Sequence, residues 1–495
     1  MALSNAPSTS SPVTRSFRDP GGRLYQVRGR IIRTVNRDGW PDLSAFLASG
    51  LAGELERSGR LVHTTPLGPD AVREVLALDR PGDTLDTAGP PGVVEHERIP
   101  FPSFPYEWPP EMLHEAARLT LDLAEELLAQ DYGLKDGTPY NILFRGPEPV
   151  FVDVLSVERR DPGNPTWLAY AQFVRTFLLP LLANRLSGLP LESLLAMRRD
   201  GLEPADVYRL AGPVRRLLPP LFSLVTMPLW LGAAHNPDDS ALYRQKSWAD
   251  VEKARFVLRH MFRGLRRHLR RVAPPVHRAS PWSDYMHRGQ NSYSELAMGE
   301  KEAFVRAALD DRRPGRVLDV GCNTGHFSAM AARTGASVVA IDSDPVVVGQ
   351  VWQRARSERL DILPLVVDLA RPTPAIGWRN QECPAFLDRA RGGFDCVLML
   401  AVIHHMLVTE RVPLPDILAL AAELTTDLLV IEFVAPDDSM FRRLTRGRAA
   451  LFTGLTTSHF ERACEPHFEI VRSHHLEGTS RWLYLLRRAG GSPRA

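Results

Sequence analysis

Short hydrophobic runs alternate with segments of helical periodicity along the C-terminal half of this chain. The runs predict strands, at residues 316–320, 337–341, 362–367, 394–400, 427–433 and 482–486. Between them, apolar residues recur every three or four positions and predict helices, at 294–309, 326–334 and 345–359. Strands that are apolar on both faces are typical of parallel sheets covered by helices on each side. The pattern therefore predicts an α/β fold with a doubly wound, mostly parallel sheet.

The N-terminal half has a mixed pattern. Residues 22–35 alternate between apolar and polar side chains and predict a hairpin of two strands. A stretch rich in proline and glycine at 79–110 predicts loop. Helical periodicity follows at 111–130, 167–184 and 248–272. Together these elements predict an α+β domain.

Changes in composition mark the expected domain boundaries. The first residues are polar and lack the apolar segment of a signal peptide, so 1–15 is expected to be a disordered tail. Prolines at 275–281 mark a linker. We therefore expect an N-terminal accessory domain at 16–275 and a second domain at 282–490. A chain of 495 residues is also too long for one ordinary core.

Composition is that of a globular protein, with 44% hydrophobic and 24% charged residues and a net charge of +2. This near-neutral charge gives no support for nucleic-acid binding. Lysine occurs at only four positions, so 56 of the 60 basic residues are arginine. Such a bias is typical of a GC-rich bacterial genome, and it lowers the weight of any arginine cluster as a binding signal.

Cysteine usage bears on metal binding and on location. The four cysteines lack the spacing of a zinc site or of a disulfide framework: Cys322, Cys383, Cys396 and Cys464. We therefore expect free thiols, no bound metal and a reducing, cytoplasmic location.

Two segments have patterns that also occur at membrane surfaces. Residues 217–234 carry no charge, but three prolines argue against a single membrane-spanning helix. We expect this segment to pack in the interior or between domains, with contact to a membrane surface as the alternative. In 255–271 an arginine recurs every four residues. It predicts the solvated face of a packed helix, although basic amphipathic helices also lie on anionic membranes or bind RNA.

The first strand of the C-terminal half ends in an acidic residue and a glycine-rich turn. Asp319 lies two positions before Gly321, and Asn323 and Gly325 complete the turn before the next helix. Glycines let the backbone turn tightly and approach a ligand. Nucleotide-dependent oxidoreductases have G-x-G-x-x-G instead, which places a pyrophosphate at the helix N-terminus. The G-x-x-x-G spacing after an acid favours a ligand that carries an ammonium and a sulfonium.

Acidic residues also follow the next two strands. Asp342 ends the second strand, where a carboxylate can accept hydrogen bonds from both ribose hydroxyls of a nucleoside. Asp368 ends the third strand, where it can accept a hydrogen bond from an adenine amino group while Leu369 packs on the ring. Because the carboxyl ends of parallel strands share one edge of the sheet, we expect these acids and Asp319 to line one site.

Over residues 316–405 this arrangement resembles the class I S-adenosylmethionine-dependent methyltransferases, which have a Rossmann-like fold. The resemblance implies S-adenosyl-L-methionine as the cofactor. It places Gly321, Asn323 and Gly325 near the methionine part, Asp342 at the ribose and Asp368 at the adenine, with Asp319, Leu369 and Leu400 in the same site. The segments NSYS, GCNTGHFS, IHHMLVTER and VIEFVAPDDSMF are similar to bacterial methyltransferases described as like nodulation proteins. Tyr293, in the first of these segments, either covers the sulfonium or packs in the core.

The fourth strand leads into two adjacent histidines, His404 and His405. Neither the N-P-P-Y motif of adenine-N6 enzymes nor the Pro-Cys nucleophile of cytosine-C5 enzymes occurs here. The resemblance thus favours O-methylation, or N-methylation, of a small-molecule acceptor. One histidine is expected to face the acceptor as a base and the other to point away, unless both only shape the pocket. The alternatives are a protein or RNA acceptor, and a non-catalytic protein that keeps the cofactor fold.

One motif in the N-terminal half has a second resemblance. Asp136 and Asn141 are five positions apart, and Asp153 follows on a strand. This spacing resembles the catalytic loop and metal-binding strand of kinase-fold phosphotransferases. No glycine-rich phosphate loop or Val-Ala-x-Lys strand precedes it, since Lys135 is the first lysine of the chain. A structural turn, a degenerate kinase-like scaffold and an active phosphotransferase all stay open.

Overall fold

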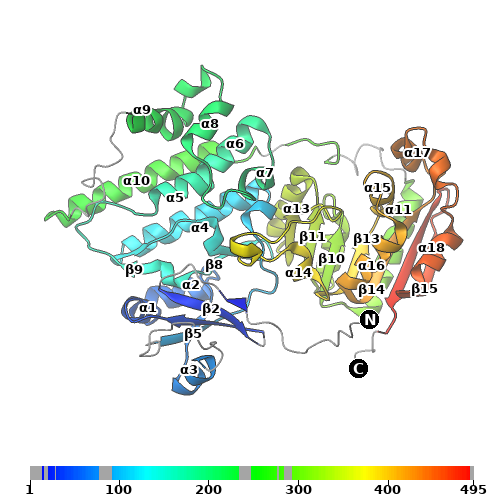
Figure 1. Cartoon of the computed structure of the whole chain (residues 1–495), viewed down its shortest axis with the longest axis horizontal. Coiled ribbons are helices and arrows are strands. Elements are labelled where there is room, and N and C mark those ends of the chain that lie inside the picture. Colours follow the sequence, from blue (N-terminus) through cyan, green and yellow to red (C-terminus); the bar gives the residue numbers. More distant parts are fainter. Residues whose placement is uncertain are drawn as a thin grey trace, which may run out of the picture.

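The computed structural model describes residues 14–15, 21–27, 29–76, 92–233, 247–275, 278–283 and 293–490. Figure 1 shows two halves side by side, the N-terminal half in blue to green and the C-terminal half in yellow-green to red. Over the described ranges, no helix is long and apolar enough to cross a membrane.

The C-terminal half is built on a seven-stranded sheet with the order β12-β11-β10-β13-β14-β16-β15. The parallel strands are β10 (Arg316–Val320), β11 (Ser337–Asp342), β12 (Ile362–Val366), β13 (Phe394–Met399) and β14 (Thr425–Val434). β16 (Arg481–Arg488) runs antiparallel to β14 and to β15 (Phe468–His475). The predicted doubly wound sheet is confirmed. β15 escaped prediction because it is an edge strand whose side chains are mostly exposed, so it has no apolar run.

Helices cover both faces of this sheet because successive side chains of a strand point to opposite sides. On β10, Val317 packs into the core beneath α11 (Glu295–Arg312) and α12 (His326–Arg333), while Leu318 packs into the core of the other face. That other face carries α16 (Leu414–Leu424) and α18 (Thr457–Cys464). The remaining helices here are α13 (Pro345–Glu358), the short η8 (Trp378–Asn380), α14 (Phe386–Ala390), α15 (Ile403–Val408), α17 (Ser439–Thr445) and the short η9 (Ala449–Phe452).

The N-terminal half begins with a five-stranded antiparallel sheet in the order β1-β2-β3-β5-β4. Its strands are β1 (Thr14–Arg15), β2 (Gly22–Val27), β3 (Arg30–Val35), β4 (Thr64–Pro66) and β5 (Gly92–His96). The helices between them are α1 (Trp40–Leu47), α2 (Gly50–Arg57) and α3 (Pro69–Leu76). The predicted hairpin at 22–35 is confirmed as β2 and β3.

Two expectations for this half differ from the structure. Thr14 and Arg15, expected in the tail, pair with β2, and the rest of 1–15 lies outside the described residues. β5 lies within the stretch 79–110 that was expected to be loop. Both strands are held by backbone pairing to a neighbouring strand, and composition carries no signal for such pairing.

A mostly helical region follows. α4 (Pro110–Leu128) is buried along most of its length. After it, β6 (Tyr132–Leu134) pairs with β9 (Val157–Arg159), and β7 (Ile142–Arg145) pairs with β8 (Glu148–Phe151). The later elements are α5 (Tyr170–Phe173), η4 (Val174–Leu178), α6 (Leu179–Ser187), α7 (Leu191–Leu195), α8 (Pro204–Leu210), η5 (Arg215–Leu217), η6 (Phe222–Thr226), α9 (Met227–Ala233) and α10 (Val251–Val272).

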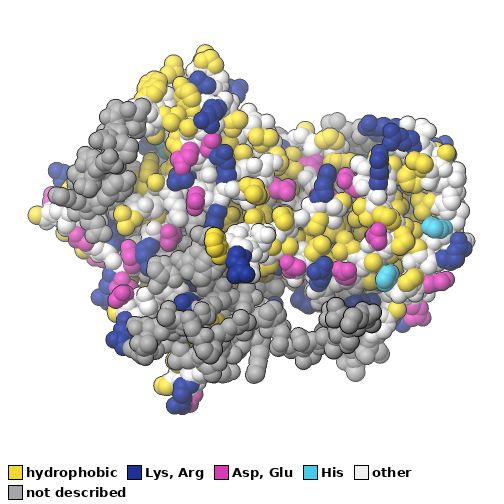
Figure 2. Space-filling view, viewed as in Figure 1, with side chains coloured by type: hydrophobic (Ala, Val, Ile, Leu, Met, Phe, Trp, Pro, Cys, Tyr) yellow, Lys and Arg dark blue, Asp and Glu magenta, His cyan; other side chains and the backbone are white. Residues whose placement is uncertain are grey.

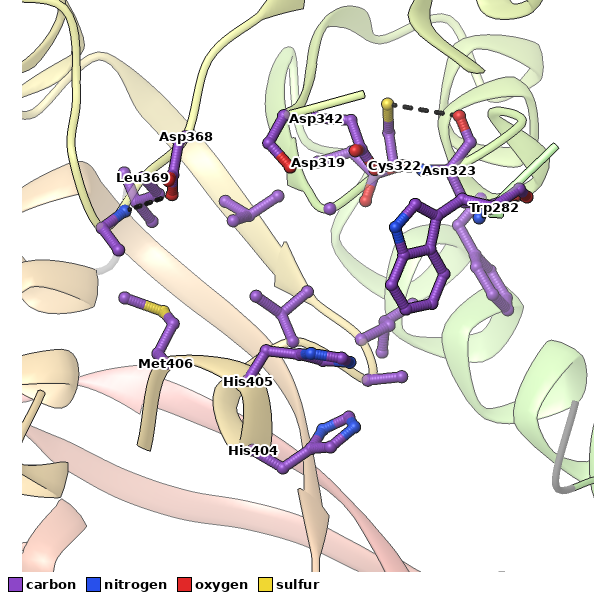
Figure 3. Close-up of a pocket in the computed structure, with 18 of the residues that line it drawn as sticks. Trp282, Asp319, Cys322, Asn323, Asp342, Asp368, Leu369, His404, His405 and Met406 are labelled. Carbon is purple, nitrogen blue, oxygen red and sulfur yellow. Dashed lines mark hydrogen bonds between the residues drawn. The ribbon is translucent and has the colours of Figure 1, made fainter. Parts of the chain in front are cut away.

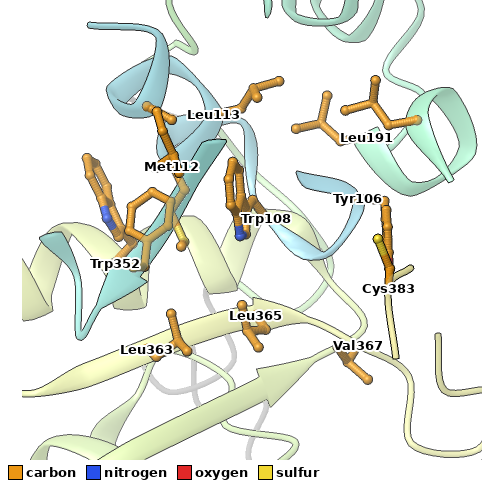
Figure 4. Close-up of a cluster of buried hydrophobic side chains, with 14 of the residues drawn as sticks. Tyr106, Trp108, Met112, Leu113, Leu191, Trp352, Leu363, Leu365, Val367 and Cys383 are labelled. Atoms are coloured by element: carbon orange, nitrogen blue, oxygen red, sulfur yellow. The ribbon is translucent and has the colours of Figure 1, made fainter. Parts of the chain in front are cut away.

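The two halves share one hydrophobic core (Figure 4). Trp108 and Met112 of the N-terminal half lie together with Trp352 of α13 and with Leu363 and Leu365 of β12. The indole Nε1 of Trp352 also donates a hydrogen bond to the Pro147 carbonyl at 2.9 Å. The N-terminal half therefore covers the β12 edge of the sheet.

A buried ion pair crosses the same interface. Arg389 of α14 donates to Glu107, at the end of η1 (Pro105–Glu107), and both side chains are almost fully buried. The Thr373 hydroxyl donates to the same carboxylate at 2.5 Å. The hydrogen bonding of the buried Glu107 carboxylate, like the apolar packing, therefore depends on both halves.

Candidate functional site

A cavity of about 350 Å³ opens at the carboxyl ends of the neighbouring parallel strands β12, β11, β10 and β13. A volume of this order suits a cofactor or a drug-sized ligand. In Figure 3, side chains from the strand ends face those of α15 across this space. The predicted residues that line it are Tyr293, Asp319, Gly321, Asn323, Asp342, Asp368, Leu369, Leu400, His404 and His405.

The loop after β10 requires glycine at position 321. Gly321 has a φ of +68°, and a Cβ there would lie 2.4 Å from a side-chain carbon of Val402. Its N–H donates to the Ile341 carbonyl at 2.8 Å, which ties the loop to β11. Asn323 also has a positive φ, a conformation that asparagine tolerates better than most residues. The loop therefore exposes backbone to the cavity.

Gly325 does not line the cavity. It is the N-cap residue of α12, with a φ of +75°. A Cβ there would lie 3.0 Å from two side-chain carbons of Val351. The sequence predicted that Gly325 approaches the ligand, whereas the structure uses it to let α12 pack closely against α13.

Two of the predicted acids are buried and held by hydrogen bonds. Asp342 accepts hydrogen bonds from the backbone N–H groups of Asn323 and Asp344, both at 3.0 Å. Asp319 accepts one from the Ser328 hydroxyl at 2.5 Å. Burial raises the pKa of each of these two carboxyl groups to about 6. A ligand that brings hydroxyl donors or positive charge would favour their ionised forms.

The third acid lies in a different environment. Asp368 is partly exposed and accepts hydrogen bonds from the Ala370 N–H and the Arg371 guanidinium, both at 3.0 Å. Leu369 and Leu400, which also line the cavity, are buried. This end of the cavity therefore combines apolar walls with one carboxylate that is already paired.

Tyr293 is fixed by a buried polar network. Its hydroxyl donates to Glu432 and accepts from Arg481 at 2.6 Å and from Lys301 at 3.1 Å. Lys301 also donates to Glu432 at 2.6 Å, and Arg481 donates to Asp438 at 2.9 Å. Burial acts to raise the pKa of Glu432, but Lys301 and Arg481 hold it below the usual range. The tyrosine ring thus lines the cavity while its hydroxyl is anchored beneath it.

His404 and His405 both line the cavity, with ring centroids 4.3 Å apart. The expectation that one of them points away is therefore wrong. It assumed strand-like alternation, but α15 begins at Ile403, and adjacent helical residues diverge by much less than strand residues. His404 is 2% exposed, whereas His405 lies edge-on to Trp282 at 5.6 Å and is less buried.

Burial also sets the protonation of these two histidines. It lowers the pKa of His405 below its ordinary value, and it lowers that of His404 further. The Arg481 charge acts in the same direction on both rings. Both imidazoles are therefore neutral at neutral pH.

The other sequence motif lies elsewhere. Asp136, Asn141 and Asp153 are in the N-terminal half and do not line this cavity. Asp153 accepts a hydrogen bond from Arg33 of β3 at 2.6 Å. Within the part of the chain that the structure describes, no three His, Cys, Asp or Glu side chains are grouped to hold a metal ion.

A family model described as "Methyltransferase domain" matches residues 291–478. "Nodulation protein NoeA" of Rhizobium meliloti (strain 1021) is 28% identical over 478 residues, 96% of each chain. The 23S rRNA (uracil(1939)-C(5))-methyltransferase RlmD of Shewanella amazonensis is 37% identical over 86 residues, 17% of this chain and 19% of its own. The crystal structure of N-methyltransferase NodS from Bradyrhizobium japonicum WM9 with S-adenosyl-L-homocysteine covers 42% of this chain and 99% of its own, with 14% identity and a TM-score of 0.29.

The family match covers six of the seven strands of the sheet, the glycine loop and every cavity-lining residue except Trp282. The C-terminal half is a class I S-adenosylmethionine-dependent methyltransferase. The methyltransferase has the predicted Rossmann-like fold and takes its methyl group from S-adenosyl-L-methionine, as predicted. Its cavity fits that cofactor, because buried carboxylates and a glycine loop with exposed backbone stand at one end and apolar walls at the other. The NoeA similarity spans both halves, so the N-terminal half is shared with that protein.

Several residues of the site were missed by sequence reasoning. Trp282 accepts a hydrogen bond from the Asn323 amide at 3.2 Å through its carbonyl, and its indole stands between the loop and His405 (Figure 3). Lys301, Glu432 and Arg481 form the network beneath Tyr293. Only Lys301 had a usable signal, because it is one of four lysines in a chain that otherwise uses arginine.

Proposed function

We propose that this methyltransferase methylates a hydroxyl group of a small-molecule acceptor that binds between Trp282 and His405. When bound, S-adenosyl-L-methionine supplies a methyl group activated by its sulfonium. In-line transfer then depends on alignment and on exclusion of water, which a walled cavity can provide. The observation that carries the proposal is the neutral imidazole of His405 on the cavity wall beside Trp282.

A neutral imidazole favours a hydroxyl acceptor. A hydroxyl must lose its proton as it attacks, whereas a neutral amine can attack first and lose a proton afterwards. His405 has a free lone pair at neutral pH because burial lowers its pKa. His404 is nearly inaccessible and its pKa is lower still, so it is the weaker base. We therefore assign the base to His405 and a packing role to His404.

The cofactor contacts are part of the same proposal. Asp342 accepts hydrogen bonds from the ribose hydroxyls, and Asp368 accepts one from the adenine amino group beside Leu369 and Leu400. The backbone at Gly321 and Asn323, with Asp319 behind it, faces the methionine part. The Tyr293 ring lies toward the sulfonium. Support comes from the position of all these residues on one cavity.

The experiment is methyl transfer from tritiated S-adenosyl-L-methionine by the full chain. A bacterial extract is first separated into a small-molecule filtrate and a macromolecular fraction. Label is expected in the filtrate. It should stay in the product after treatment with mild alkali, because a methyl ether resists alkali whereas a methyl ester is hydrolysed. Label in precipitated protein or RNA would contradict the small-molecule acceptor, and cofactor binding without transfer would indicate a binding protein.

Two variants test the role proposed for His405. His405→Gln should abolish most of the transfer while leaving cofactor affinity unchanged. His459→Gln, at an exposed histidine on α18, is the matched control and should behave like the unmodified chain. Loss of cofactor binding in His405→Gln would mean that this residue supports the cofactor site instead.

We also propose that residues 16–275 form an accessory domain on a degenerate kinase-like scaffold, which packs against the methyltransferase domain at 282–490. An antiparallel sheet precedes α4. The segment with Asp136 and Asn141 lies between β6, which pairs with β9, and β7, which pairs with β8, and Asp153 follows β8. In kinase-fold enzymes the equivalent aspartate holds magnesium. Here the guanidinium of Arg33 forms an ion pair with Asp153, so a magnesium ion would have to compete with it for the carboxylate.

Calorimetry with ATP and magnesium tests the scaffold proposal. The full chain is expected to show no magnesium-dependent ATP binding. ATP hydrolysis that disappears in Asp136→Ala would contradict the proposal and indicate an active phosphotransferase.

A further inference from the structure

Apolar side chains gather on the surface of the N-terminal half, over η5, η6 and α9. This apolar patch consists of Leu217, Leu218, Phe222, Met227, Trp230 and Leu231. Leu217 is 59% exposed and Trp230 is 56% exposed, and the rings of Phe222 and Trp230 meet edge to face at 6.1 Å. In Figure 2 hydrophobic side chains spread over the region of α8 and α9. The interior packing expected for residues 217–234 holds for only some of them, such as Leu224 and Val225.

Arginines border this apolar patch. Arg185, Arg215 and Arg271 line one groove together with Leu218 and the two prolines that follow it. All three arginines are exposed, although they come from α6, η5 and α10. Between Asp206 and Asp238 the sequence contains no acidic residue. The border of the patch is therefore positively charged.

The positive surface continues along α10. Arg259, Arg263 and Arg267 are exposed on this helix, which has no acidic residue after Glu252. Its apolar face is buried, so these arginines are held facing solvent. Arg255 and Arg266 differ, because each pairs with a carboxylate.

We propose that the apolar patch and its arginines dock this protein on the surface of an anionic lipid bilayer. Tryptophan and aliphatic side chains partition into the boundary between headgroups and acyl chains, and guanidinium groups bind phosphate. The described helices are too short or too polar to cross a membrane, so the contact is with the surface. RNA would use the arginines but not the aliphatic side chains. In a two-fold contact with a second copy, the arginine borders of both copies would face each other and repel.

This docking surface is independent of the proposed function. The patch lies on η5, η6 and α9 of the N-terminal half, whereas the cofactor cavity lies at the strand ends of the C-terminal sheet. Substitutions in the exposed patch should therefore leave cofactor affinity unchanged. A measurement of cofactor affinity also verifies that each variant has folded.

The experiment is flotation of the full chain with lipid vesicles. One set contains phosphatidylcholine alone, and the other contains phosphatidylcholine with phosphatidylglycerol. Binding is expected to be tighter by about tenfold or more on the anionic vesicles, because their negative surface potential attracts the arginines that border the patch. The pair Trp230→Ser and Leu231→Ser, and separately the pair Arg215→Gln and Arg271→Gln, should each weaken binding by about tenfold or more.

Matched controls come from the C-terminal half. Leu451→Ser removes a leucine that is 75% exposed on η9, and Arg442→Gln with Arg443→Gln removes two exposed arginines on α17. These controls should bind vesicles as the unmodified chain does. The proposal is overturned by absence of vesicle binding, by equal binding to both vesicle types, or by patch variants that bind normally. It is also overturned if the patch variants instead dissolve a dimer or release bound RNA.

Discussion

The carboxylate of Asp342 accepts a hydrogen bond from the backbone N–H of Asn323 at 3.0 Å. The acid at the end of β11 is thereby tied to the glycine loop at the end of β10. Each fixes the other, so the part of the site proposed for the ribose and the part proposed for the methionine are positioned together before the cofactor binds. Preformed geometry of this kind reduces the ordering that binding would otherwise require.

Replacing Asp342 by alanine should weaken binding of S-adenosyl-L-methionine by about 1–3 kcal/mol. The variant loses a buried acceptor for the ribose hydroxyls and leaves the Asn323 N–H without its partner. Calorimetry measures the affinity, and Asp388→Ala, at an exposed acid on α14, is the control. Unchanged affinity in Asp342→Ala would remove this residue from the cofactor site.

Cofactor affinity should decrease as the pH falls through about 6. The pKa values of Asp319 and Asp342 are raised to about 6, so both carboxyl groups take up protons in that range. Only the ionised forms accept hydrogen bonds fully or attract a cationic ligand. The expected slope is at most about tenfold per pH unit for each carboxyl.

The stability of the cofactor-free protein should change with pH in the opposite direction. A raised carboxyl pKa means that the folded state binds more protons than the unfolded state between the ordinary aspartate pKa of about 4 and the raised pKa of about 6. The contribution of these two groups to the free energy of unfolding is therefore present at low pH and is lost as the pH rises through 6. Denaturant titrations of the unmodified chain and of Asp342→Asn isolate it, because the variant should show a flatter pH dependence.

Turnover should depend on His405 more than on His404. His405→Gln is expected to lower kcat by about 10²–10⁴-fold without a change in cofactor affinity, as for loss of a general base. His404→Gln should have a smaller effect on turnover. In the unmodified enzyme the rate should rise with pH and level off below 6.5, because the pKa of His405 is lowered by burial. Equal losses in both variants would instead indicate that the pair only shapes the cavity.

Breaking the ion pair between the halves should destabilise the whole chain. Arg389→Ala leaves Glu107 buried without its cationic partner, and loss of one member of a buried pair typically costs about 3–5 kcal/mol. Arg391→Ala, two residues away, removes exposed pairs with Glu423 and Asp388 and should change the free energy of unfolding by less than about 1 kcal/mol. Denaturant midpoints of the two variants give the comparison. Similar midpoints would mean that the halves are not coupled through this contact.

The sequence alone was sufficient for the central part of the fold and of the site. Buried parallel strands need continuous apolar runs, and a backbone that turns toward a ligand needs glycine, so β10 to β14 and Gly321 left local patterns. Asp319, Asp342 and Asp368 could be grouped in advance because the carboxyl ends of parallel strands always meet at one edge.

What only the tertiary structure decided depends on contacts between distant residues. The close contact with Val351 gives Gly325 a role in helix packing, and hydrogen bonds to Glu432 and Arg481 fix Tyr293. Neither contact leaves a local pattern in the sequence. The ion pair between Arg389 and Glu107, which joins the two halves, likewise cannot be predicted from periodicity because the two residues are far apart in the sequence. Periodicity reports which side of an element is apolar, but not which surface will cover it. For that reason the amino-acid sequence was sufficient to predict a methyltransferase, whereas the core that joins the two halves could be seen only in the tertiary structure.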